Sequence, residues 1–208
     1  IRRVEGPVAG AVVGVVEDVA SREVDLGVDR GLHPGGLGFR WSGAEEVDAL
    51  VGDEHEIAPG VTVRFVRAGH LLGAASVEIK AKSALGGRQH WLFSGDVGRY
   101  DAPILRDPEP PASVPDALLL ESTYGDRNHP DDDPTRELAA IIRRTFDRGG
   151  CVLSPAFALG RTQDLLFHLS EIALAGGVDP DVVFLDSPMA IKATEIYRQA
   201  TPEFDAET

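Results

Sequence analysis

Three apolar segments of this chain each end at a polar residue of a kind that can bind a metal ion or transfer a proton. The polar residues are His70, Asp96 and Glu121, which lie 26 and 25 residues apart. Short apolar or alternating runs predict strands, so the sequence places His, Asp and Glu at three strand ends. This repeated pattern predicts a sheet-based, metal-dependent hydrolase. The three segments are Val61–Val66, Trp91–Phe93 and Ala117–Leu120.

The composition is that of a globular protein with one large domain or two small ones. The chain has 208 residues, of which 43% are hydrophobic, and no apolar run approaches the roughly 18 residues of a membrane-spanning helix. Its formal net charge of −14 argues against broad electrostatic binding of nucleic acid, but it leaves room for a local phosphate site. The single cysteine, Cys151, excludes an internal disulfide and favours a reducing cytoplasm. We expect it to be buried as a small hydrophobic residue.

Residues 1–40 carry the least structural signal. Val12–Val16 is a candidate strand, but Gly27–Gly38 is rich in glycine and follows neither the helical nor the strand period. This segment is either a loose surface region or poorly determined sequence, and we expect His33 within it to be solvated. Because the chain starts at Ile1 rather than at Met, we expect it to be an internal fragment of a longer protein.

The middle of the chain predicts a short helix and an extended connection. Ser42 and Glu45 form a capping-box pattern for a helix that would run to Leu50. The proline-rich stretch from Pro103 to Pro115 predicts an extended connection, and Ala117–Leu120 then predicts a buried strand.

A β-hairpin is predicted between these two regions. Val77–Ala81 and His90–Phe93 are its strands, and Ser83–Arg88 joins them. His90 lies in an otherwise apolar strand, so we expect it to have a structural rather than a catalytic role.

Helical and strand signals alternate from Asp133 onward. Asp133 is suited to cap a helix that has Pro134 in its first turn and ends at Gly149-Gly150. The triplet Asp131-Asp132-Asp133 has the composition of an acidic metal site, but a solvated approach to a capped helix is the simpler interpretation. The alternation predicts a parallel sheet with crossover helices. Its segments are Cys151–Ser154 (strand), Thr162–Ala175 (helix), Val182–Leu185 (strand) and Ala190–Ala200 (helix).

Two of the strand-end residues have the chemistry of zinc ligands. Zinc sites in hydrolases use His nitrogen and Asp oxygen and keep one position open for water. Two neighbouring metal ions can share a carboxylate and stabilise the attacking and leaving oxygens at a phosphorus atom. His70 and Asp96 suit these roles because each lies between small residues that leave room for an ion. A Gly-His-Leu-Leu-Gly turn is also a reasonable loop without a metal, so the residues alone leave both interpretations open.

Five ordered motifs resemble the β-CASP branch of the metallo-β-lactamase fold: GHLLGAAS, FSGDVGR, ESTYGDRNH, SPAFALGRTQ and LDSPMA. This family consists of RNA-processing nucleases, and the bacterial exonuclease type is the most similar. The resemblance covers roughly Val61 to Thr208. It implies an α/β chain in which a partial metallo-β-lactamase αββα sandwich (residues 1–128) precedes the start of a β-CASP parallel α/β domain (residues 129–208). It also implies RNA as substrate, two zinc ions (Zn2+) per intact site and a homodimer of the full-length protein.

The resemblance also implies roles for individual residues. His70 matches a histidine ligand of one zinc ion, and Asp96 matches the aspartate that bridges both ions. Glu121 matches an acidic catalytic residue that orients a histidine. Arg161 would contact substrate phosphate near the start of a helix, since helix N-termini attract anions. An ion pair between two elements of the fold is the alternative role for this residue. The residues implied to bind substrate are Arg127, His129, Arg161 and Ser187.

One family motif is missing from the sequence. A His-x-His-x-Asp-His motif should precede His70, but none of the six histidines forms such a pair, and the later β-CASP histidines should follow Thr208. One His and one Asp cannot hold two zinc ions, so we expect this chain by itself to be inactive and to bind zinc weakly. The parent protein is expected to hydrolyse RNA phosphodiester bonds by zinc-activated hydroxide. Two alternatives stay open: a non-catalytic RNA-binding or scaffold protein of the same fold, and a hydrolase of small esters.

Overall fold

The structure is a computed structural model of the chain, and it describes residues 13–17, 38–42, 46–83, 86–128, 133–177, 179 and 183–205. The chain forms two compact units, each of which includes segments distant in sequence. We call Ile1–Asp25 with His129–Arg198 the parallel-sheet unit, and Leu26–Asn128 with Gln199–Thr208 the antiparallel-sheet unit. Each unit is described by itself.

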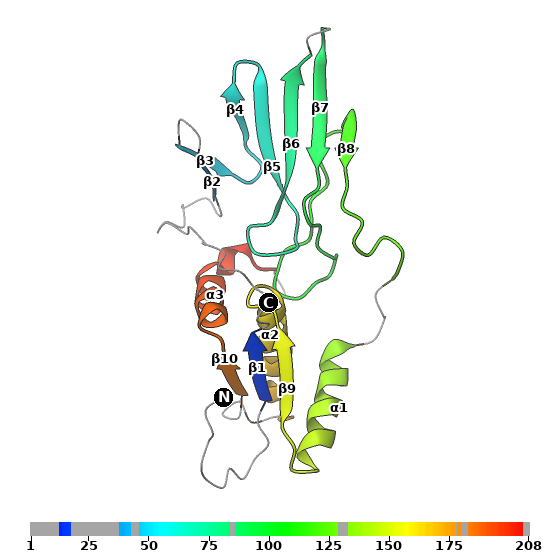
Figure 1. The fold of residues 1–208 in the computed structure, drawn as a ribbon, viewed down its shortest axis with the longest axis vertical. Helices are drawn as coiled ribbons and strands as arrows, with labels where there is room; N and C mark the ends of the chain where they lie inside the picture. The colour runs from blue at the N-terminus through cyan, green and yellow to red at the C-terminus, as the bar shows by residue number, and fades with distance from the viewer. Residues whose placement is uncertain are drawn as a thin grey trace. The chain divides into compact units, whose positions relative to one another are not determined.

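A five-stranded sheet in the order β4-β5-β6-β7-β8 dominates the antiparallel-sheet unit (Figure 1). Strands β4 to β7 pair antiparallel with their neighbours, whereas β8 runs parallel to β7 after the proline-rich connection. The predicted strand at β5 and the predicted β6–β7 hairpin are therefore confirmed. The bounds are β4 Glu54–Ala58, β5 Val61–Arg67, β6 Ala75–Lys82, β7 Arg88–Phe93 and β8 Ala117–Leu119.

The parallel-sheet unit contains a three-stranded sheet in the order β10-β1-β9, with both neighbours parallel to the central strand. Its strands are β1 Val13–Glu17, β9 Val152–Ala156 and β10 Val183–Asp186. The helix α2 (Arg161–Leu174) connects β9 to β10, as Figure 1 shows. The predicted parallel sheet with a crossover helix is confirmed, and so is the candidate strand near the start of the chain.

Two helices bury the apolar core of this unit. Ile142 of α1 (Pro134–Phe146) is fully buried with Leu169 and Ile172 of α2, and Val152 and Val183 of the sheet pack against them. The predicted cap is confirmed, because the Asp133 carboxylate accepts hydrogen bonds from the first-turn N–H groups of Thr135 (2.9 Å) and Arg136 (3.2 Å). A third helix, α3, spans Pro188–Gln199, and the short 3-10 helix η2 follows at Thr201–Glu203.

Three expectations from the sequence are wrong. The segment Ser42–Leu50 is not a helix, because β2 (Gly38–Ser42) and β3 (Glu46–Leu50) pair as antiparallel strands. The capping-box signal is local and weak, and pairing of the two strands overrides it. Ala117–Leu120 is not buried: Leu118 is 51% and Leu120 65% exposed, because the strand lies at the sheet edge. Cys151 is exposed rather than buried.

His33, Asp131 and Asp132 lie outside the described residues. None of the helices in the described part of the chain combines the length and hydropathy that crossing a membrane requires.

Candidate metal and substrate site

A closed turn after β5 carries His70. The backbone N–H of Ala68 donates to the carbonyl of Ala74 at 3.0 Å, which closes the turn and leaves the imidazole exposed. Gly69 adopts a left-handed backbone (φ +66°), and a Cβ placed there would lie 2.8 Å from the backbone nitrogen of Pro108. Both the conformation and the space therefore require glycine at this position. Gly69 is therefore what allows the turn to pack against the proline-rich connection.

The turn after β7 carries Asp96, which is also exposed. Ser94 is buried at the start of this turn, and its N–H donates to the carbonyl of Leu119 at 2.9 Å. At the other end of the turn, the N–H of Gly98 donates to the carbonyl of Ala68 at 2.7 Å. The Asp96 turn is thus fixed both to the end of β8 and to the turn that carries His70.

Glu121 follows β8 and supports the Asp96 turn. Its carboxylate accepts hydrogen bonds from the N–H groups of Val97 (3.2 Å) and Thr123 (3.1 Å), and its own N–H donates to Ser94 Oγ at 2.9 Å. Hydrogen bonds from Thr123 and then from Val97 lower the pKa of Glu121, and the nearby His70 imidazole acts in the same direction. The structure therefore brings the three predicted strand-end residues into one region.

The chemistry of these donors fits a metal ion, but only in part. An imidazole nitrogen and a carboxylate oxygen are the donors that zinc prefers, and His70 and Asp96 are both exposed on adjoining turns. Within the described ranges no group of three His, Cys, Asp or Glu residues could hold a metal ion. His70 and Asp96 would therefore be two ligands of a site that needs further donors.

The residues predicted to bind substrate are divided between the two units. In the antiparallel-sheet unit, exposed Arg127 pairs with Asp126 at 3.0 Å, and its guanidinium lies 5.8 Å from the ring centroid of Tyr124. In the parallel-sheet unit, Arg161 and Ser187 follow the parallel strands β9 and β10, at the same edge of the sheet. His129 lies outside the described residues.

The Arg161 side chain is accessible to a substrate, whereas the Ser187 side chain is not. Arg161 is exposed, and its guanidinium lies 3.9 Å from the Asp164 carboxylate, which is a weak ion pair. Ser187 is buried, and its hydroxyl accepts a hydrogen bond from the N–H of Ala190 at 3.0 Å near the start of α3. In this conformation the Ser187 hydroxyl therefore stabilises the helix start.

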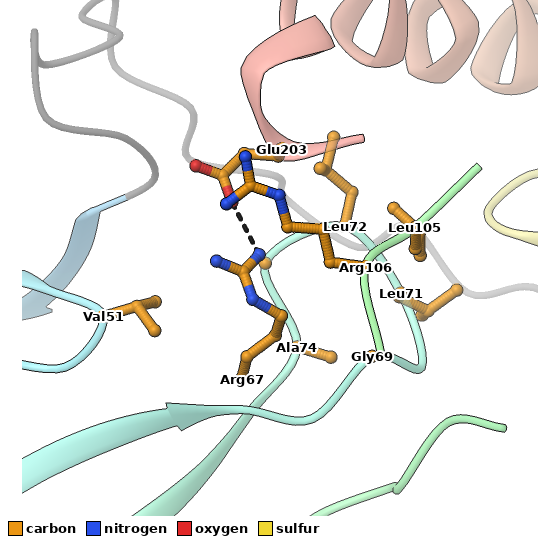
Figure 2. A pocket seen from close by; sticks show the side chains of 10 residues that line it. Val51, Arg67, Gly69, Leu71, Leu72, Ala74, Leu105, Arg106 and Glu203 are labelled. Atoms are coloured by element: carbon orange, nitrogen blue, oxygen red, sulfur yellow. Dashed lines mark hydrogen bonds and ion pairs between the residues drawn. The ribbon is translucent and has the colours of Figure 1, made fainter. Parts of the chain in front are cut away.

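An ion-pair cluster lies beside the turn that carries His70, and nothing in the sequence predicted it. Arg67 at the end of β5 pairs with Glu203 at 2.7 Å and with Glu109 at 3.3 Å (Figure 2). Burial alone would lower the pKa of Arg67, but its hydrogen bonds to Glu203 and Glu109 outweigh that effect and raise it. The cavity here has a volume of only about 20 Å³, room for about one water molecule.

Gly98 was also missed as a site residue, although it lies inside the FSGDVGR motif. A Cβ at this position would overlap the carbonyl group of Gly69 and lie 2.7 Å from the backbone nitrogen of His70. A glycine two residues after Asp96 was the only signal for this contact in the sequence. Which backbone it approaches is visible only in the folded chain.

Comparison with known proteins places these observations in a family. No family model matches the chain. Ribonuclease TTHA0252 of Thermus thermophilus is 34% identical over 173 residues, which are 79% of this chain and 38% of that protein. Endoribonuclease YSH1 of Yarrowia lipolytica is 37% identical over 144 residues, 67% of this chain and 16% of that protein. Transcription termination factor FttA of Pyrococcus horikoshii is 32% identical over 156 residues, 74% of this chain and 23% of that protein.

The chain thus spans well under half the length of these relatives. The mixed α/β fold and the relatives together define a metallo-β-lactamase-fold protein. Within that fold, the chain belongs to the β-CASP branch. The predicted family and fold class are confirmed, whereas the assignment of each unit to a family domain stays a prediction.

Proposed function

We propose that the protein is a metal-dependent nuclease that hydrolyses phosphodiester bonds of RNA. The observation that carries the proposal is the convergence of His70, Asp96 and Glu121 at adjoining strand ends. The names of the relatives TTHA0252 and YSH1, ribonuclease and endoribonuclease, support RNA as the substrate.

The proposed metal is zinc, with His70 and Asp96 as two of its ligands. When bound, zinc would activate a water molecule as nucleophile and neutralise charge on the phosphate. Glu121 would hold the Asp96 turn in place through the N–H of Val97, and it would also orient a histidine supplied from elsewhere. Substrate phosphates would be bound by Arg127, His129 and Arg161. Ser187, also predicted to bind substrate, is buried and would instead fix the start of α3.

Three further expectations belong to this proposal. A cytoplasmic location is supported by the single cysteine, and a homodimer of the full-length protein is expected. The 208-residue chain by itself would be inactive, because its sequence supplies two zinc ligands and lacks the His-x-His-x-Asp-His motif.

Cleavage of a 5′-labelled single-stranded RNA by the protein from its complete gene tests the nuclease proposal. Asp96→Ala is expected to lower cleavage about 1,000-fold or more, since a catalytic metal contributes several kcal/mol to the transition state. Asp53→Ala, at an exposed aspartate just before β4, is the matched control and should cleave normally.

Unchanged cleavage by the Asp96→Ala protein would defeat the assignment. Tight RNA binding without cleavage by the wild-type protein would favour the non-catalytic alternative instead. Activity on small esters but not on RNA would favour the second alternative, a hydrolase of small esters.

A further inference from the structure

Gly98 is required for reasons of space and not of conformation. Its backbone does not adopt the left-handed region, in contrast to Gly69 and Gly95. A residue with a side chain would therefore not be forced into the left-handed region at position 98. What excludes a side chain is the close approach of the Gly69–His70 peptide, whose carbonyl group and nitrogen occupy the place of a Cβ.

The turn that carries His70 has little room to move away, because backbone of the proline-rich connection lies close behind Gly69. A Cβ at Gly69 would itself lie 2.8 Å from the nitrogen of Pro108 and 3.1 Å from the carbonyl oxygen of Arg106. The proline-rich connection therefore packs directly behind the turn. The Pro108 nitrogen and the Arg106 oxygen belong to the backbone, so no side-chain rotation can relieve an overlap with them.

The Asp96 turn is the part that would have to shift. Its first residue is held by hydrogen bonds from Ser94 N–H to Leu119 and from the N–H of Glu121 to Ser94 Oγ. A methyl group at position 98 would push against the 2.7 Å hydrogen bond from Gly98 to Ala68. The displacement would fall on residues 95–98, and Asp96 is among them.

We propose that Gly98 is a positioning residue that sets the separation of His70 and Asp96, and with it the geometry of a metal ion bound by both. This inference rests on the proposed function, because it assumes that the two residues share a metal site. It goes further by assigning the spacing of the two donors to one backbone contact. Metal geometry is sensitive to such supports, and loss of an outer support typically lowers affinity about 10- to 100-fold.

The test uses the protein from its complete gene with cobalt(II) as the probe, because the absorption spectrum of cobalt reports the geometry of its ligands. Gly98→Ala is expected to lower cobalt affinity about 10- to 100-fold, to change the spectrum and to reduce kcat on RNA with little change in KM. Far-UV circular dichroism should be unchanged, since β7 and β8 keep their hydrogen bonds.

Gly125→Ala is the matched control. Gly125 also lacks a left-handed backbone, and the nearest atom to an added Cβ is the Ser122 carbonyl oxygen at 3.3 Å, a much milder contact. Cobalt affinity and spectrum should be those of the wild type. Equal behaviour of Gly98→Ala and Gly125→Ala, beside a wild type that binds cobalt, would overturn the inference alone. A wild type that binds no cobalt would overturn the proposed function and the inference with it.

A second variant decides the question if Gly98→Ala does not fold. Pro108→Ala removes the ring that packs behind Gly69 and adds no heavy atom, so it loosens the support without an overlap. Cobalt affinity is expected to fall about two- to five-fold, less than for a lost direct support. Wild-type affinity and spectrum in Pro108→Ala would count against a turn held rigidly between the proline-rich connection and Gly98.

Discussion

The interiors of the two units of this protein are stabilised by different kinds of contact. In the parallel-sheet unit, Ile142, Leu169 and Ile172 form an apolar cluster, and the buried polar residues are neutral side chains such as Gln163. The antiparallel-sheet unit instead buries charge. Glu78 is 1% exposed and lies 3.3 Å from Arg64 and 3.6 Å from His90.

This difference separates stability from site geometry. Apolar packing resists changes of volume, but it does not by itself aim a side chain at a metal. The strand-end turns of the antiparallel-sheet unit are fixed by backbone contacts and by carboxylate–amide hydrogen bonds, which have strict geometry. Disruption of the first kind of contact should therefore lower stability, and disruption of the second should alter metal binding.

The largest expected effect on stability comes from the ion pair beside the His70 turn. Arg67→Met removes the guanidinium that pairs with both Glu203, whose side chain is 10% exposed, and Glu109. Removing one member of a buried pair typically costs about 3–5 kcal/mol, so we expect a loss of about 4 kcal/mol in the free energy of unfolding by urea. The double variant Arg67→Met/Glu203→Leu should recover most of it.

Arg127→Met is the control for that experiment. Its ion pair with Asp126 is exposed, so the expected loss is below about 1 kcal/mol. Equal losses for Arg67→Met and Arg127→Met would show that the Arg67 cluster contributes no more than a surface pair.

A somewhat smaller effect is expected from the apolar core of the parallel-sheet unit. Ile142→Ala should cost about 3 kcal/mol in the free energy of unfolding, because truncation of a fully buried isoleucine leaves a cavity. Cobalt affinity of the folded protein should not change, in contrast to Gly98→Ala. Ile191→Ala in α3 is the control, because its side chain is 45% exposed. It should lower the free energy of unfolding by about 1 kcal/mol or less. Loss of cobalt binding by Ile142→Ala without loss of stability would break the contrast between the units.

Local sequence signals were enough to predict most elements of the fold. The cap at Asp133 and Pro134 in the first turn predicted α1, and alternation predicted β5. The same local reasoning failed at Ser42–Leu50, where pairing of β2 with the neighbouring strand β3 outweighed a helix-start signal. Nor did it predict that β1 pairs with both β9 and β10, since pairing over such a distance in sequence leaves no local trace.

The residues proposed to bind metal could be predicted from the sequence, but the residues that hold them in position could not. His70, Asp96 and Glu121 stood out because polar residues at strand ends are recognisable in a sequence. Gly98 and the Arg67–Glu203 pair did not stand out, because each depends on which segments approach in space. Glycine and paired charges occur throughout the chain for other reasons, so only the folded structure identifies the ones that position the site.

The smallest expected effect concerns substrate binding by the parallel-sheet unit. Arg161 begins α2, and its weak pair with Asp164 leaves the guanidinium free to contact phosphate. Loss of a charge-assisted hydrogen bond costs about 1.5 kcal/mol, so Arg161→Ala should raise KM for RNA about 10-fold and leave kcat unchanged. Arg161→Lys should be intermediate, because lysine keeps the charge but not the two-pronged geometry. Arg148→Ala, at an exposed arginine just beyond α1, is the control and should leave KM unchanged. An unchanged KM in Arg161→Ala together with lower stability would assign Arg161 to its ion pair with Asp164, and the parallel-sheet unit would then lack its best-placed phosphate ligand.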